Sequence, residues 1–131
     1  MSDETPFIDI HNHLLPGVDD GSADIDMSLR LIEKGQEEGI GAWVLTPHVI
    51  EAFTERIDER HRAAFADLQS AIDARNIGVE LYLGSEIMFQ EDVTNIRSRW
   101  SSTINNNGKY FLMEFPMAFF PVHAEEILFQ F

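Results

Sequence analysis

The sequence predicts an α/β fold with a mainly parallel sheet. Apolar segments with strand character alternate four times with segments of helical character. This alternation is typical of βα units, in which helices connect parallel strands. Functional residues of such folds gather where strands end and loops begin, and the candidate residues described below fall at such places.

The first predicted strand covers residues 7–13, where apolar and polar side chains alternate. Its Asp9, His11 and His13 share one face, because successive side chains of a strand point to opposite sides. A turn-rich stretch follows, and Ser22 is then a favourable N-cap for a helix that runs to about residue 38.

The rest of the chain repeats this pattern. Further strands are predicted at residues 42–46, 79–84 and 109–115. Helices are predicted at residues 54–75 and about 90–100, and a last helix is expected to begin near residue 122. The helix at 54–75 has the clearest apolar stripe, formed by Ile57, Ala64, Leu68 and Ile72.

Length and composition narrow the possible functions. A chain of 131 residues with 44% apolar residues fits one modest domain with a real core. The absence of cysteine excludes a disulfide framework, a thiolate zinc site and a cysteine nucleophile. The net charge of −14 disfavours binding to nucleic acid. No apolar segment approaches the ~20 residues of a membrane helix, and the N-terminus lacks signal-peptide features, so we expect a cytoplasmic protein without membrane insertion.

The C-terminal end suggests an incomplete domain. The last predicted helix has barely begun where the 131 residues end, and four βα units do not close a barrel. We therefore expect a fragment whose last strand is an unprotected edge. The alternatives are a compact four-unit α/β domain and a half-barrel that closes by forming a homo-oligomer.

Two histidines open the candidate site. Because His11 and His13 are two residues apart on a predicted strand, both imidazoles can reach one metal ion or two adjacent ions. Asp9 lies on the same face, where its carboxylate could accept a hydrogen bond from a ligand imidazole. An H-x-H pair by itself is also common on protein surfaces.

Further candidate ligands follow the next strands. Asp19-Asp20-Gly21 is either a simple turn or a source of a ligand, and His48 follows the second strand directly. Glu86 follows the third strand, and Glu114 lies within the apolar fourth strand, where a carboxylate is costly to bury unless it is paired or bound to metal. A neutral or salt-bridged core glutamate is the alternative interpretation.

Taken together, these nitrogen and oxygen donors suit Mn²⁺, Zn²⁺ or Fe, and their carboxylates can bridge neighbouring ions. A site with several metal ions activates water and binds phosphoryl oxygens, so phosphate ester hydrolysis is the predicted reaction. We interpret the two remaining histidines structurally: His61 as a packing or boundary residue of the long helix, and His123 as a capping or surface residue.

The run D-I-H-N-H-L-L-P-G-V-D-D-G at residues 9–21 resembles the opening motif of the bacterial tyrosine phosphatases of the PHP superfamily. These are manganese-dependent enzymes linked to capsular and exopolysaccharide synthesis. Matching segments follow in the family's order, namely residues 38–40, 46–48, 84–87 and 114–116. The resemblance covers essentially the whole chain. Val49 departs from the family pattern, because many relatives have a polar or basic residue at the position after His48.

The resemblance implies a distorted (β/α)₇ TIM-like barrel, of which residues 1–131 would form the N-terminal half as a partial PHP domain. It implies up to three metal ions at the ends of the strands, and a metal-activated water that attacks phosphotyrosine on a polysaccharide-synthesis tyrosine kinase. The implied ligands are His11, His13, Asp20 and His48, with Glu86 and Glu114 as bridging ligands.

Other ligands of the family, and its phosphate-binding arginines, would lie beyond residue 131. The chain alone is therefore expected to be weakly active or inactive. Two alternatives stay open. One is a PHP phosphoesterase acting on a small monoester such as histidinol phosphate, and the other is a non-catalytic metal-binding remnant that oligomerises.

Overall fold

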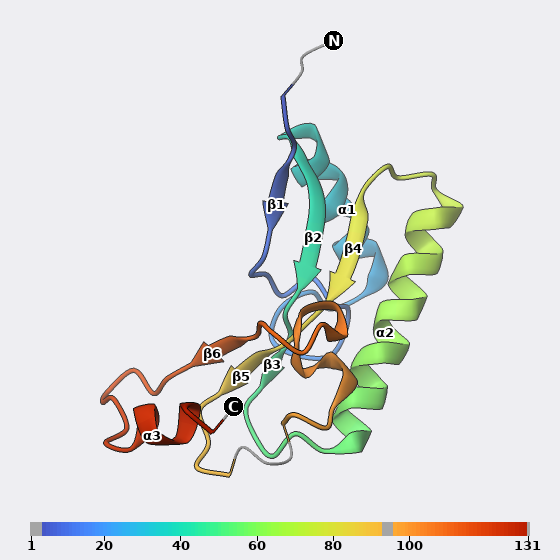
Figure 1. The fold of residues 1–131 in the computed structure, drawn as a ribbon. Coiled ribbons are helices and arrows are strands. Elements are labelled where there is room, and N and C mark those ends of the chain that lie inside the picture. Colours follow the sequence, from blue (N-terminus) through green and yellow to red (C-terminus); the bar gives the residue numbers. More distant parts are fainter. Residues whose placement is uncertain (1–3, 93–95, 131) are drawn as a thin grey trace.

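The computed structural model describes residues 4–92 and 96–130, which form six short strands and three α-helices (Figure 1). The strands are β1 (Phe7–Asp9), β2 (Ile40–Leu45), β3 (His48–Val49), β4 (Glu80–Leu83), β5 (Glu86–Met88) and β6 (Leu112–Glu114). The helices are α1 (Ile25–Glu37), α2 (Glu55–Ala74) and α3 (Ala124–Leu128), with 3₁₀ turns η1 (Trp100–Ser102) and η2 (Ile104–Asn106).

All strand pairs are parallel, and the strands form two small sheets in the orders β1-β2-β4 and β3-β5-β6. Only Thr46 and Pro47 separate β2 from β3, and only Gly84 and Ser85 separate β4 from β5. Backbone hydrogen bonds continue across this gap, from Gly84 N–H to the Leu45 carbonyl at 2.8 Å and from Glu86 N–H to the Pro47 carbonyl at 2.9 Å. The predicted α/β fold with a parallel sheet is confirmed, and the two sheets are successive parts of the same pair of strands.

The first strand is shorter than predicted, because it ends at Asp9 rather than His13. The Asp9 carboxylate accepts hydrogen bonds from the His11 backbone N–H and the Asn12 amide, which turns the chain out of the strand. The Asn12 amide also donates to the Val44 carbonyl at 2.9 Å. The His-Asn-His segment is therefore a loop attached to β2.

The start of α1 also differs from the prediction. Asp24 rather than Ser22 is the N-cap, and its carboxylate accepts the Met27 backbone N–H at 2.8 Å. Ser22 is buried instead, and its hydroxyl bonds to that of Ser28 at 2.6 Å. Ser and Asp are both favourable N-cap residues, and Asp24 takes this position here because the Ser22 side chain is buried.

The long helix α2 lies within the predicted range and begins after its N-cap, Thr54. It runs beside both sheets (Figure 1). On the inner face of α2, Leu68 and Ile72 pack into one apolar cluster with residues of α1, β2 and β4. A second, smaller cluster is formed by Val49, Phe53, Ile87 and Ile96. Burial of each such side chain contributes about 1.5–3 kcal/mol, so these clusters provide much of the stability of the fold.

The C-terminal third differs most from the expectation. Residues 93–95 of the helix expected at 90–100 lie outside the described residues, and the described residues of this segment are not α-helical. The fourth strand covers only residues 112–114, and the last helix begins at Ala124. The buried Asp58 of α2 accepts hydrogen bonds from the backbone N–H and hydroxyl of Ser101, which connects the β5–β6 segment to this helix.

Within the described part of the chain, β1 and β6 are the outer strands of their sheets. Large apolar side chains are exposed near both strands, among them Phe7, Ile8, Phe119 and Phe120. Among the described residues, no helix is both long and apolar enough to cross a membrane.

His61 is buried on α2, as its interpretation as a packing residue requires, with 2% of its surface exposed. Burial lowers the pKa of this imidazole from 6.5 to about 4, and the positive charge of Arg60 acts in the same direction. The carboxylates of Asp19 and Asp58 oppose this shift only in part. His61 is therefore neutral in the folded protein at pH 7.

We predict that His61 makes the protein less stable as the pH falls from 6.5 towards 4. In this window the unfolded chain takes up a proton at His61 and the folded chain does not, so the free energy of unfolding decreases, by about 3 kcal/mol at most. Urea unfolding of the protein and of His61→Phe at pH 7 and pH 4.5 measures this contribution. The loss between the two pH values should be smaller for His61→Phe, whereas His123→Phe at an exposed site should behave as the parent. Equal losses in the parent and His61→Phe would contradict the buried neutral imidazole.

Candidate metal centre

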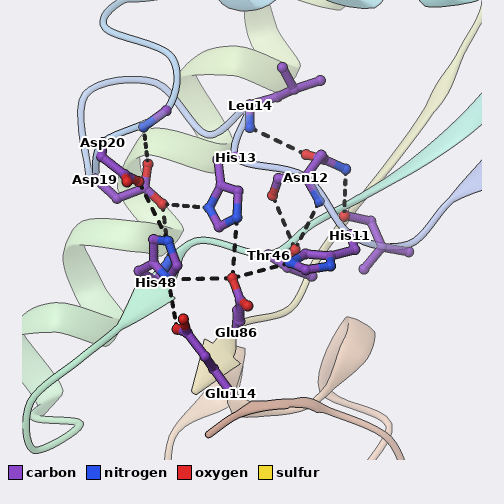
Figure 2. A network of polar contacts seen from close by, with 12 residues as sticks. His11, Asn12, His13, Leu14, Asp19, Asp20, Thr46, His48, Glu86 and Glu114 are labelled. Atoms are coloured by element: carbon purple, nitrogen blue, oxygen red, sulfur yellow. Dashed lines mark hydrogen bonds and ion pairs between the residues drawn. The ribbon is translucent and has the colours of Figure 1, made fainter. Parts of the chain in front are cut away.

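The candidate site lies at the junction between the two sheets (Figure 2). The loop after β1 brings His11 and His13 to this junction, and the first residues of β3 and β5 bring His48 and Glu86. His48 and Glu86 are directly paired in the parallel register of these two strands. Glu114, the last residue of β6, completes the group from the neighbouring strand.

Three imidazoles converge on one oxygen of Glu86 (Figure 2). The Oε2 atom lies 3.1 Å from His11 Nε2, 3.2 Å from His13 Nε2 and 3.3 Å from His48 Nδ1. The rings of His13 and His48 are stacked with their centroids 4.3 Å apart. Glu114 Oε2 lies 3.4 Å from His48 Nδ1, so a second carboxylate approaches the same nitrogen.

Two buried atoms of this group have no hydrogen-bond partner among the described residues. They are Oε2 of Glu86, which is only 8% exposed, and Nδ1 of His48, and the two lie close together. A buried carboxylate oxygen is costly unless it accepts hydrogen bonds or lies beside a cation. Imidazole and carboxylate groups are suitable ligands for Zn²⁺, Mn²⁺ or Fe, so the donor set fits such ions.

All six side chains that the sequence suggested as ligands come together. They form three overlapping sets whose donor atoms lie within 4.8 Å of one another: His11, His13 and Glu86; His13, Asp20 and His48; and His48, Glu86 and Glu114. Because Glu86 and two of the histidines each belong to two sets, the geometry suits neighbouring ions with shared ligands. Asp20 is the most exposed of the carboxylates, and it lies 3.5 Å from His48 Nε2.

Asp19 is an important residue that the sequence analysis did not single out. Its buried carboxylate accepts hydrogen bonds at 3.0 Å from the backbone N–H groups of His48 and Gly21. It also lies 3.0 Å from His13 Nδ1. Because a carboxylate only accepts, His13 Nδ1 is the donor in this contact, and the opposite ring nitrogen, Nε2, faces Glu86.

The ionisation of Asp19 is set by the same contacts. Burial alone would raise the pKa of this carboxyl, but the hydrogen bonds from the His48 and Gly21 backbone and from His13 outweigh it. The pKa therefore lies below its ordinary value of 3.8, and Asp19 is ionised near neutral pH. The Asp-Asp-Gly turn was the available signal, but it does not reveal which aspartate is buried.

The turn also requires its glycine. A Cβ atom on Gly21 would lie 2.1 Å from the carbonyl oxygen of His13, so a larger residue would displace the histidine. This carbonyl accepts the Ser22 backbone N–H at 2.9 Å. Gly21 therefore allows the turn to close tightly over the His-x-His loop.

Asp9 has a different role from the one expected. Its described hydrogen bonds go to the His11 backbone and the Asn12 side chain, and not to an imidazole. Asn12 is attached in turn to Thr46, whose hydroxyl donates to the Asn12 carbonyl and accepts the Asn12 backbone N–H, both at 3.1 Å. These bonds fix the loop against the end of β2, and thereby the positions of both imidazoles.

Comparisons with known proteins show similarity to tyrosine-protein phosphatases. CapC of Staphylococcus aureus is 28% identical over 94% of this chain, and the tyrosine-protein phosphatase YwqE of Bacillus subtilis is 29% identical over 93%. A solved structure from a study of YwqE and Streptococcus pneumoniae CpsB, described as unique metal-dependent tyrosine phosphatases, superposes on 95% of this chain with a TM-score of 0.83 and 29% identity.

The chain spans about half of these proteins: it covers 48% of the length of both CapC and YwqE and 50% of the solved chain. The model of the family described as capsular polysaccharide synthesis, CpsB/CapC, matches residues 7–123. This match includes all six residues of the candidate metal centre. The chain therefore belongs to the CpsB/CapC family of capsular polysaccharide synthesis.

Proposed function

We propose that this chain supplies much of the active site of a metal-dependent protein-tyrosine phosphatase. The observation that carries the proposal is the approach of three imidazole nitrogens to Glu86 Oε2, all within 3.3 Å. The similarity to tyrosine phosphatases that are metal-dependent supports the reaction. Because the relatives are about twice as long, we propose that these 131 residues form part of the site and half of a (β/α)₇ TIM-like barrel.

In this proposal the six clustered residues hold up to three ions, with Mn²⁺ as the first candidate and Zn²⁺ or Fe as alternatives. Bound ions would supply an activated water and neutralise the charge that develops on the phosphoryl group. Asp19 keeps His13 Nε2 directed inward, and the Thr46–Asn12 contacts hold the loop. The substrate is phosphotyrosine on a protein, and we propose a polysaccharide-synthesis tyrosine kinase, in keeping with the family.

The Glu86 carboxylate is the group on which metal binding should depend most. We expect Glu86→Gln to lose most of the bound metal, because the substitution keeps the shape of the side chain and removes its charge. The measurement is the metal content per chain by mass spectrometry after loading with Mn²⁺ and dialysis. Glu59→Gln, which changes an exposed carboxylate of α2, is the control and should retain the parent's content. An unchanged metal content in Glu86→Gln would contradict the assignment.

Phosphatase activity tests the reaction itself. With Mn²⁺, we expect this chain to hydrolyse a phosphotyrosine peptide faster than the matched phosphoserine peptide, and at a rate far below that of full-length YwqE. The rate should fall at least tenfold in Glu86→Gln, because activation of water depends on the ions. Phosphate release measures all three comparisons.

Three results of this assay would count against the proposal. Faster hydrolysis of histidinol phosphate than of the phosphotyrosine peptide would favour a small-monoester phosphoesterase. Equal rates in the parent and Glu86→Gln would place the activity elsewhere or in a contaminant. A rate equal to that of full-length YwqE would show that these 131 residues already form a complete site.

A further inference from the structure

A cavity of about 390 Å³ adjoins the candidate metal centre on the side of α2. Asp20 and His48 form part of its wall, so the cavity and the centre share residues. The rest of the wall comes from Val18 and Asp19 beside Asp20, from Val49 and the two residues that follow it, and from the first turns of α2. A volume of this size is within the range of pockets that bind small ligands, which is roughly 300–1,000 Å³.

Much of this wall is aliphatic. Val49 is buried, Ile57 is half-buried, and Ile50 is 63% exposed beside the cavity. Covering this exposed isoleucine with an apolar group removes apolar surface from water, which favours the binding of such a group. The segment Val49-Ile50 directly follows His48, so a group that binds at the centre is within reach of these side chains.

Two polar residues of α2 also line the cavity. Arg60 is the only cation among the described residues of the wall, and its guanidinium is held in place by a 2.8 Å hydrogen bond to the Gly17 carbonyl. His61 is 2% exposed, and its buried Nδ1 has no hydrogen-bond partner among the described residues. A cavity whose wall combines aliphatic side chains with a few fixed polar groups is typical of a small-molecule site.

The charge of the wall determines when a phosphate compound can bind. Asp19, Asp20 and Glu51 contribute three carboxylates against the single cation Arg60. Without metal ions these carboxylates repel a phosphate dianion, and with several divalent ions at the centre the attraction prevails. Binding of a phosphate compound here should therefore require metal.

From these observations we propose that the cavity binds the aromatic ring of a phosphotyrosine whose phosphate lies at the candidate metal centre, with Ile50 and Ile57 as the ring contacts. This inference rests on the proposed phosphatase function. It adds a reason why an aryl phosphate is preferred over an alkyl phosphate, namely the contact between the ring and the aliphatic wall. Ile50 and Ile57 are thus specificity-determining residues.

The test compares two ligands that differ only in the presence of a ring and cannot be hydrolysed, phenylphosphonate and methylphosphonate. Calorimetric titration of the Mn²⁺-loaded chain should show phenylphosphonate binding about tenfold more tightly, as expected for burial of part of a ring. Ile57→Ala and Ile50→Ala should each reduce this preference several-fold and leave the affinity for methylphosphonate unchanged. Leu31→Ala, an exposed leucine of α1 that does not line the cavity, is the control and should keep the preference.

The outcomes separate this inference from the proposed function. Equal affinity for the two phosphonates would overturn the aryl pocket and leave the metal-dependent phosphatase standing. A lack of binding by both to the metal-loaded chain would overturn both proposals. A preference that is unaffected by either isoleucine variant would place the ring elsewhere and also overturn the inference.

Methyl resonances of the unaltered chain provide a second measurement that does not depend on how the variants fold. With the chain loaded with diamagnetic Zn²⁺, phenylphosphonate should shift the δ1-methyl signals of Ile50 and Ile57, and methylphosphonate should shift them much less. Ile32 and Ile72, which lie in the main apolar cluster, should not respond to the ring. Equal shifts with both ligands at Ile50 and Ile57 would contradict the proposal.

Discussion

The structure of this protein is organised around one buried carboxylate oxygen. Three imidazole nitrogens approach Glu86 Oε2 within 3.3 Å, at a position that is almost closed to water. Such an arrangement is expensive for a protein that has nothing to place between these atoms, because a buried carboxylate needs hydrogen bonds or a cation. At a metal site the positive charge of the ion would offset the free energy that burial of the carboxylate costs. Much of the surrounding chain serves to hold these donors in place.

The parallel register places two of these donors side by side. The breaks at Thr46-Pro47 and Gly84-Ser85 leave the register unchanged, since Leu45 pairs with Leu83 before them and His48 pairs with Glu86 after them. Hydrogen bonds across the gap keep the two sheets aligned. The loop after β1 closes the site from the other side, with Asp19 orienting His13 and supporting the backbone of His48.

The sequence predicted the candidate ligands better than the residues whose hydrogen bonds hold them in place. The sequence could place three of the candidate ligands together, His48, Glu86 and Glu114, because the strand ends of a parallel sheet share one edge. This inference needs only approximate positions of the strands. The supporting contacts depend on individual hydrogen bonds. The sequence does not show that Asp9 binds backbone or that Asp19, not its neighbour, is buried. The strand lengths and the described residues of the segment 90–100 also differ from the prediction, because tertiary contacts such as the Ser101–Asp58 hydrogen bonds are not visible in the local sequence pattern.

We propose that the converging nitrogens and carboxylates are metal ligands, and anomalous diffraction at the manganese edge would locate the bound ions. Crystals of the chain grown with Mn²⁺ should show anomalous peaks between Glu86 Oε2 and the nitrogens of His11 and His13, with a further peak near His48 and Glu114. Manganese found only at exposed surface carboxylates, with the histidines still in direct contact with Glu86 Oε2, would rule out this ligand assignment.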